Sequence, residues 1–522
     1  MKRWLVIGVW GAVLLSIGVI LIRAFTPAYP TIEFKTSEGK AGEIIVGVHP
    51  SLMTCMQTAS QISQALLGAC PICQVPYTRC QYELSERLKI IEGREASEFA
   101  LCFENCSLML APTLIEPARA PCELFERGGL RNCLGRSEKL VYPASSNTTR
   151  LTRPVAIDFW LDSLIPFWAT VSFGLLIMLS APIHRNWTAD HPADGVQKLH
   201  GRIVSRVGGL ALLCGSIAPL VGMAAAANFQ MDLSKWLWQP QHAGIAILQL
   251  LIIASLPAFL FGFFEDVSGR VSVLMRMAAT FASAALAWWF SGVSIQRLDL
   301  GPIDFFLSFT PVAVAFTVFS VAGVANSMNI IDGLHGLSSG VGALAIAALG
   351  VLAWAVGDNA LASVAVVLMA ATAGFFILNY PWGRIFLGDG GAYVLGFWVA
   401  WLSVLLVARN PDVSPWACLL VVLYPVTEVV YSIKRRLVLK RHPGHPDREH
   451  LHSLLKLNWI SKRYPRLAPD WQNALSTPGL LALSVLPMGV ALLFYNRPLY
   501  LAAGGLVFFL LYSLTYRHLT KG

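Results

Sequence analysis

The sequence predicts an all-α polytopic membrane protein with about eleven spanning helices, one N-terminal anchor helix and a small cysteine-rich domain. Of its 522 residues, 55% are hydrophobic and only 13% are charged. A soluble globule of this composition would expose a large apolar area, so that class is excluded. Apolar runs of about 20 residues, the length that crosses a bilayer, recur along the chain. Basic residues gather in alternate loops between these runs, as in membrane proteins.

Twelve apolar runs have the length of a membrane span. They are 4–23, 159–182, 207–227, 244–264, 272–291, 308–328, 337–356, 360–379, 391–408, 415–433, 478–495 and 498–516. The first run is either a retained anchor or a cleaved signal peptide. We favour an anchor, because the run is long and lacks a small-residue cleavage site. The sequence therefore divides into an anchor (1–23), a polar domain (24–157) and a multi-span domain (158–522).

The distribution of Lys and Arg predicts the orientation of the spans. One set of loops includes the dense basic run 434–466, whereas the opposite set holds only Lys235, Arg297, Arg409 and Arg497. Because basic loops stay on the cytoplasmic side, both termini are expected there. The net charge of +9 is then mainly a topology signal. A nucleic-acid partner is not expected, because no basic stretch is interleaved with aromatic residues.

The polar domain 24–157 holds eight of the ten cysteines and is expected outside the cytoplasm. An even number of cysteines in a short exoplasmic segment predicts a disulfide framework, because a small core gains stability from cross-links. A redox or metal site at Cys70 and Cys73 is the alternative. Neither the disulfide pairing nor the partner of this domain follows from the sequence.

Polar residues at the cytoplasmic ends of spans are the candidate site, because acids and amides near bilayer depth are costly and usually functional. The segment 198–209 carries Lys198 and Arg206 ahead of a Gly-Gly pair. The adjacent acids Glu265 and Asp266 close the fourth run. Two neighbouring carboxylates require a cation or hydrogen-bond donors nearby, although such a pair is often only solvated.

The segment 326–337 combines two amides and a carboxylate at helical spacing, with a histidine after them: Asn326, Asn329, Asp332 and His335. We expect Asn329 and Asp332 to share one face as a helix ends at Gly333. Asp389 lies among glycines at the start of another span. Oxygen ligands of this kind suit Mg²⁺, and glycines allow close backbone approach.

The longest cytoplasmic loop carries a further basic and acidic group. Its members are Asp447, Arg448, His450 and His452. Zinc is not favoured, because no third ligand accompanies the histidines at the usual spacing. Arg and His are better suited to binding phosphates, and a solvated basic loop is the alternative.

Taken in order, these segments resemble the polyprenyl-phosphate N-acetylhexosamine-1-phosphate transferases, glycosyltransferase family 4. The resemblance rests on the Asn-x-x-Asn-x-x-Asp-Gly-x-x-Gly-Leu pattern at 326–337 and the Phe-x-Gly-Asp-x-Gly pattern at 386–391. The Asp-Arg-x-His-x-His pattern at 447–452 is similar to the branch that starts O-antigen, common antigen or teichoic acid synthesis. The muramoyl-pentapeptide branch instead has consecutive histidines there.

The resemblance implies roles for these residues. Asn329 and Asp389 would lie nearest a Mg²⁺ ion, for which Mn²⁺ can substitute. The implied catalytic residues are Glu265, Asp266, Asp332 and Asp389, with the acidic pair facing the lipid phosphate. The implied substrate-binding residues are Lys198, Arg206, Asn326, His335, Asp447, Arg448, His450 and His452. The chain departs from the family pattern at Ser205, Glu265 and His335.

The implied activity is transfer of N-acetylhexosamine-1-phosphate, above all GlcNAc-1-phosphate, from a UDP-sugar to undecaprenyl phosphate. UMP would leave, and the product would start a cell-surface polysaccharide. The expected place is the bacterial inner membrane, with the active site cytoplasmic and a homodimer considered. The alternative is a polytopic transporter or lipid flippase, whose ion-coupling residues would lie at the bilayer midplane. A receptor would leave the cytoplasmic polar segments unexplained.

Overall fold

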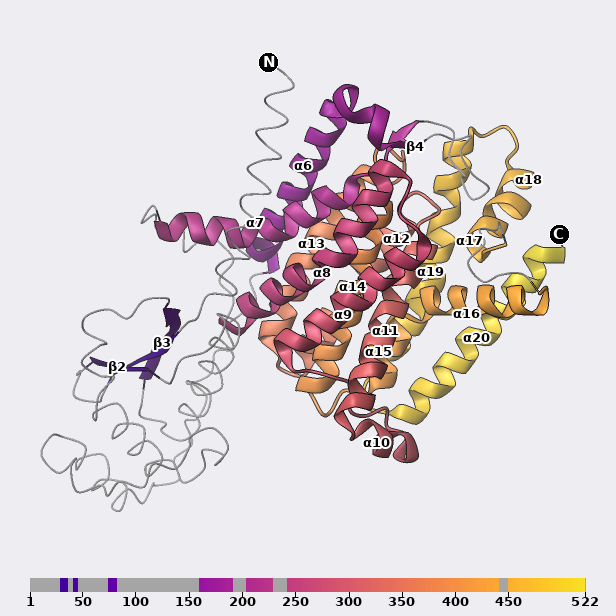
Figure 1. Cartoon of the computed structure of the whole chain (residues 1–522). Coiled ribbons are helices and arrows are strands. Elements are labelled where there is room, and N and C mark those ends of the chain that lie inside the picture. The colour runs from indigo at the N-terminus through magenta and orange to yellow at the C-terminus, as the bar shows by residue number, and fades with distance from the viewer. Residues whose placement is uncertain are drawn as a thin grey trace, which may run out of the picture. The chain divides into compact units, whose positions relative to one another are not determined.

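The structure is a computed structural model and describes residues 159–190, 203–228, 242–440 and 449–521, together with three N-terminal strands (Figure 1). Several expectations lie outside the described residues: the anchor at 4–23, the disulfide framework, and the sites Lys198, Asp447 and Arg448. These stay predictions.

The three strands form one small antiparallel sheet in the order β2-β1-β3. They are β1 (Tyr29–Lys35), β2 (Ala41–Ile45) and β3 (Gln74–Gln81). In β1, Thr31 pairs with Ile45 on one side and with Arg79 on the other. The strands lie within residues 15–156, a compact unit distinct from the helices. The region between the first two apolar runs therefore contributes some β structure to a chain predicted as all-α.

The remainder is helical, and nine helices of the described part are long and apolar enough to cross a membrane. They are α6 (Phe159–Thr188), α8 (His242–Ser268), α9 (Val273–Ser291), α11 (Thr310–Ile330), α12 (Leu337–Ala355), α13 (Asn359–Asn379), α14 (Gly388–Arg409), α19 (Pro469–Phe494) and α20 (Pro498–Lys521). The helix α7 (Gly208–Asn228) has a shorter apolar stretch. The prediction of an integral, multi-span membrane protein is thus confirmed.

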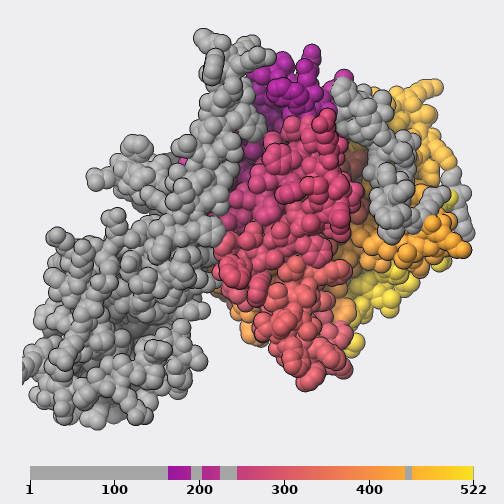
Figure 2. Space-filling model, in the orientation of Figure 1, coloured from indigo at the N-terminus to yellow at the C-terminus, as the bar shows by residue number. Residues whose placement is uncertain are grey.

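Burial separates the central helix from the peripheral helices. In α14, 89% of the most apolar window is buried, whereas in α20 only 17% is buried. Figure 2 shows one face of the packed helices, and exposed large side chains of the bundle include Trp289, Phe319 and Leu499. Apolar side chains in such numbers suit a lipid-facing surface. The central position of α14 makes its N-terminus the point where other segments meet.

The run 415–433, which was predicted as one span, is broken in the structure. It forms α15 (Pro415–Val421) and α16 (Leu423–Val438), which meet at Val422 with a bend of 76°. Pro425 has no N–H to donate to the carbonyl of Val421, so the helical ladder is interrupted there. In Figure 1, α16 runs across the direction of its neighbours.

The remaining described elements are short: β4 (Ala189–Asp190), β5 (Val204–Ser205), α10 (Gly301–Leu307), α17 (Leu451–Leu454), η2 (Leu455–Ile460) and α18 (Ser461–Arg463).

A second expectation concerned the end of α11. The helix was expected to end at Gly333, but it ends at Ile330. The residues 331–336 form turns before α12 begins at Leu337. Asp332 therefore lies in a turn, and it does not continue the helical face of Asn329. The glycines and the closely spaced polar side chains of this segment favour turns over a further helical turn.

Candidate active site

The site is centred on the N-terminus of α14, which is held by a buried carboxylate from α8. The two oxygens of Asp266 accept hydrogen bonds from the backbone N–H groups of Asp389, at 2.9 Å, and of Gly390, at 3.0 Å. Asp266 is only 2% exposed. A carboxylate suits this position because the first N–H groups of a helix have no partner within the helix. In this structure Asp266 fixes α14, and its expected role toward a lipid phosphate stays a prediction.

Glycines allow this close approach. A Cβ on Gly262 would lie 2.5 Å from the nitrogen of Gly390, and one on Gly209 would lie 2.4 Å from the nitrogen of Gly391. Gly208 and Gly209 also donate to the carbonyls of Phe386 and Leu387, at 2.9 and 2.8 Å. The Gly-Gly pair and the Gly-rich start of α14 are therefore required by close contact of α7, α8 and α14.

Arg206 and Glu265 stabilise the C-terminal end of α8 and the residues that follow it. Arg206 donates from Nε to the carbonyl of Asp266 at 3.0 Å and from Nη2 to that of Glu265 at 3.4 Å. The Glu265 carboxylate accepts from the N–H of Val271 at 2.8 Å. A cation at a helix C-terminus is favoured by the exposed carbonyls there. Both side chains thus stabilise the segment that carries Asp266.

Asp389 is the acid that these contacts position, and its side chain stays 24% exposed. One oxygen accepts from Nδ2 of Asn329 at 2.9 Å, and the other forms an ion pair with Arg276 of α9. In the sequence, Arg276 is only one of many basic residues in loops that are expected to be cytoplasmic. Its place ten residues after the acidic pair, at the start of the next span, was the available signal. The 326–337 and 386–391 segments therefore meet at one carboxylate.

Asp332 lies near Asp389 in the turn after α11. Burial, and then the negative charge of Asp389, raise the pKa of Asp332 to about 8. A buried carboxyl group beside the negative charge of Asp389 forms a place where a cation is stabilised. Asn326 lies one turn from Asn329, and donates to Thr280 Oγ1 at 3.0 Å and to the Ala322 carbonyl at 2.8 Å. It thus joins α11 to α9.

His335 is buried, with an exposed fraction of 3%, in contacts between three segments. Its N–H donates to Oδ1 of Asn473 and its carbonyl accepts from Oγ1 of Thr477, both at 2.7 Å. Its ring nitrogen Nδ1 lies 3.2 Å from the carbonyl of Pro381. These contacts fix the turn after α11 against α19. The expected contact of His335 with substrate stays a prediction.

The two histidines of the 447–452 segment lie against this same turn. The rings of His450 and His452 stack with centroids 5.4 Å apart and planes 8° apart. Nε2 of His452 would lie 2.7 Å from a Cβ on Gly333, so this ring packs directly on the turn that holds Asp332. On their other side, Nδ1 of each histidine faces the buried carboxylate of Glu428. Sequence reasoning did not identify Glu428.

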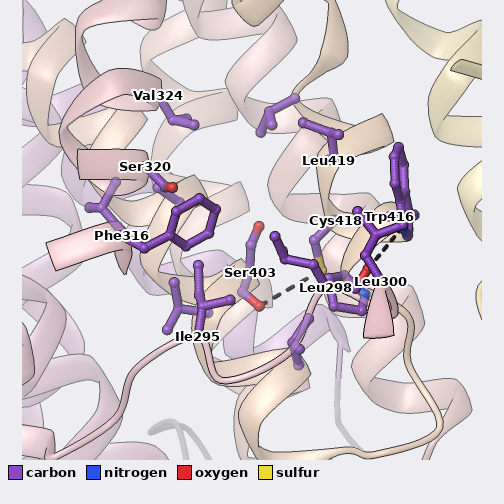
Figure 3. Close-up of a pocket in the computed structure, with 16 residues that line it drawn as sticks. Ile295, Leu298, Leu300, Phe316, Ser320, Val324, Ser403, Trp416, Cys418 and Leu419 are labelled. Atoms are coloured by element: carbon purple, nitrogen blue, oxygen red, sulfur yellow. Dashed lines mark hydrogen bonds between the residues drawn. The ribbon is translucent and has the colours of Figure 1, made fainter. Parts of the chain in front are cut away.

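An apolar cavity lies elsewhere in the described helices. It has a volume of about 270 Å³ and is lined almost entirely by apolar side chains of α11, α14 and α15, such as Phe316, Val404 and Leu419 (Figure 3). Trp416 Nε1 donates to the carbonyl of Leu298 at its edge, at 2.9 Å. Its lining begins at Ala400 of α14, eleven residues after Asp389, or about 16 Å along the helix. The polar chemistry is thus separate from this cavity.

The fold and the site together define an integral membrane protein in which carboxylates, amides and basic side chains from several distant segments gather near helix ends. Residues 248–407 match glycosyl transferase family 4, which assigns this part of the chain to that family. The resemblance drawn from the segments 326–337 and 386–391 is confirmed.

Three relatives illustrate the similarity. A probable undecaprenyl-phosphate N-acetylglucosaminyl 1-phosphate transferase of Bacillus subtilis is 27% identical over 282 residues, covering 52% of this chain and 71% of the relative. The undecaprenyl-phosphate alpha-N-acetylglucosaminyl 1-phosphate transferase of Thermotoga maritima is 27% identical over 289 residues, covering 54% of this chain and 78% of the relative. The Salmonella typhi protein of the same description is 30% identical over 194 residues, covering 36% of this chain and only 50% of the relative's length.

Proposed function

We propose that this protein transfers GlcNAc-1-phosphate from UDP-GlcNAc to undecaprenyl phosphate at the cytoplasmic face of a bacterial inner membrane. The observation that carries the proposal is the convergence of Asn329, Asp332 and Asp389 on one point at the membrane edge. The descriptions of the relatives supply the lipid and the sugar. The product would start a cell-surface polysaccharide.

The proposed reaction is a phosphoryl transfer. An oxygen of undecaprenyl phosphate attacks the β-phosphorus of UDP-GlcNAc. The bond between this phosphorus and the bridging oxygen breaks, and UMP leaves with the electron pair. No strong base is required, because a phosphate monoester with a second pKa of about 6 is largely dianionic at neutral pH. The main tasks of the protein are to neutralise charge and to align the two phosphates.

The donor set fits Mg²⁺. Among the described residues no three His, Cys, Asp or Glu side chains form a metal cage, and Mg²⁺ usually binds through one or two carboxylates and substrate phosphates. Asp389 and Asn329 would hold the ion, and Asp332, with its raised pKa, would gain from a cation nearby. When bound, Mg²⁺ would neutralise the diphosphate and polarise its oxygens.

Other side chains of the protein would position Asp389 and bind the phosphates. Asp266, through the N–H groups of α14, keeps Asp389 in place. Arg276, which faces Asp389, would be available to a phosphate when a cation takes its place beside the carboxylate. His450 and His452, together with Arg448, would bind the diphosphate of the nucleotide sugar. Because the polar groups lie at helix ends, the transporter alternative is not favoured.

The test is an in vitro assay of UMP release from a panel of UDP-sugars with undecaprenyl phosphate. We expect turnover with UDP-GlcNAc and Mg²⁺, loss of turnover with EDTA, and recovery on adding Mg²⁺ or Mn²⁺. Turnover that persists in EDTA would contradict the metal proposal. Absence of turnover with every UDP-sugar would contradict the function itself.

A further inference from the structure

We infer that Glu428 is a positioning residue, whose buried carboxylate aims His450 and His452 at the diphosphate of the sugar nucleotide. The inference rests on the proposed function and names a residue of α16 outside the 447–452 segment. Glu428 is 1% exposed, so its charge is stabilised by protein groups and not by bulk water. Those groups come from α16 itself and from residues 450–452, more than 20 residues further along the chain.

The donors around Glu428 are divided between its two oxygens. Oε2 lies 3.5 Å from Nδ1 of His450 and accepts from the N–H of Leu451 at 3.3 Å. Oε1 lies 3.9 Å from Nδ1 of His452 and accepts from the hydroxyl of Tyr424 at 3.3 Å. Each imidazole therefore faces one carboxylate oxygen, and a backbone N–H between the histidines is fixed as well.

A carboxylate bound at one ring nitrogen of a histidine determines the direction in which the other ring nitrogen points. With the proton of Nδ1 directed to Glu428, Nε2 points to the opposite side of each ring. For His452 that side is the turn at Gly333, next to Asp332. The ring of His450 stacks parallel to that of His452 and has its own Nδ1 at the same carboxylate, so its Nε2 also points away from Glu428. The carboxylate thus presents two Nε2 atoms to the place where the diphosphate is proposed to bind.

The bent helix α16 holds the histidine segment at a second point. Arg435, seven residues and two turns after Glu428, lies on the same helix face. It forms an ion pair with Glu449 at 3.0 Å and donates to the Glu449 carbonyl at 2.7 Å. The hydroxyl of Tyr516 in α20 donates to that carbonyl at 3.0 Å. The break at Val422 therefore allows side chains on one face of α16 to bind the chain at residues 449–452.

The experiment compares Glu428→Gln and Glu428→Asp with the wild-type protein in the UMP-release assay. Glu428→Gln removes the charge and offers one acceptor oxygen, so we expect the KM for UDP-GlcNAc to rise about tenfold or more. The KM for undecaprenyl phosphate should stay within about twofold, because the histidines are assigned to the nucleotide sugar. Glu428→Asp keeps the charge with a shorter reach, and should give an intermediate KM.

Two further measurements separate positioning from a general loss of structure. In a His450→Ala/His452→Ala background, Glu428→Gln should lower kcat/KM by less than about threefold, because coupled residues are not additive. The matched control is Asp358→Asn, which neutralises a carboxylate 6% exposed and paired with Arg409 at the far end of α14. It should leave both KM values unchanged.

The outcomes are distinguishable. An active wild-type protein whose Glu428→Gln and Glu428→Asp variants keep a normal KM for UDP-GlcNAc would overturn the inference. Equal losses from Glu428→Gln with and without the two histidines would overturn it as well. If Glu428→Gln does not yield folded protein, Glu428→Asp decides. A wild-type protein inactive with every UDP-sugar would instead overturn the proposed function.

Discussion

Replacement of Asp389 by Asn tests the centre of the site, because it removes one charge and changes little else. Asn keeps the side-chain shape and the N-terminal position on α14, so Asp266 can still bind the same backbone N–H groups. The ion pair with Arg276 is lost, and the amide must replace an oxygen that accepts from Asn329. The perturbation is therefore electrostatic and local.

The magnitude follows from these two contacts. A hydrogen bond to a charged group contributes about 1.5–3 kcal/mol, and both partners are partly exposed, so the free energy of unfolding should fall by about 1–3 kcal/mol. A protein with a stability of about 5–15 kcal/mol stays folded after such a loss. Loss of a proposed metal ligand should cost about 4 kcal/mol or more in the transition state, a fall in kcat/KM of about 10³.

The assay is UMP release by purified protein, with thermal unfolding measured on the same preparation. Asp358→Asn is the matched control, because it makes the same chemical change about 30 Å away along α14. We expect a similar loss of stability from the control but a kcat/KM within about twofold of wild type. Near-normal turnover by Asp389→Asn would refute the site assignment, as would equal losses of activity from both variants.

Two further predictions concern residues close to His452, one in space and one in the sequence. Gly333→Ala places a Cβ 2.7 Å from Nε2 of His452, whereas Gly323→Ala meets nothing within 4 Å. The first variant should lose about 1–3 kcal/mol of stability and raise the KM for UDP-GlcNAc, and the second should do neither; equal behaviour would contradict the packing of His452 on this turn. Burial lowers the pKa of Lys456 to about 8, against an opposing effect of Asp470. At pH 7 the positive charge on Lys456 therefore destabilises the folded state. This destabilisation is lost as the pH rises from about 8 to 10.5. Lys456→Met should add about 1–3 kcal/mol of stability at pH 7 and nothing at pH 10.5 in thermal unfolding; a gain that does not depend on pH would show that the charge is not its cause.

Many of the candidate residues could be found in the sequence, because their polarity conflicts with the bilayer around them. Asn329 and Asp389 stand out at the ends of apolar runs, and the structure brings these two side chains to 2.9 Å. Arg276 and Glu428 could not be found in this way. Arg276 is one of many basic residues in loops that are expected to be cytoplasmic, and Glu428 lies in a run that was assigned to a single span. Their importance depends on which residues face them.

The sequence by itself determined the class of protein and the positions of most spans. A helix must hide about 20 residues of apolar side chains in a bilayer, and this requirement is local and can be counted. It also determined the family, through two short patterns of acids, amides and glycines. Spacing within one segment was enough for both conclusions.

Only the tertiary structure decided how the segments are used. Asp266 binds the N-terminus of α14 across 123 residues of sequence, and Glu428 faces two histidines more than 20 residues away. The bend at Val422, which lets α16 reach the histidines, was hidden in an apolar run. A buried charge is stabilised by the hydrogen-bond donors that surround it. The packing of distant helices decides which donors these are, and the spacing of residues along the chain does not encode that packing.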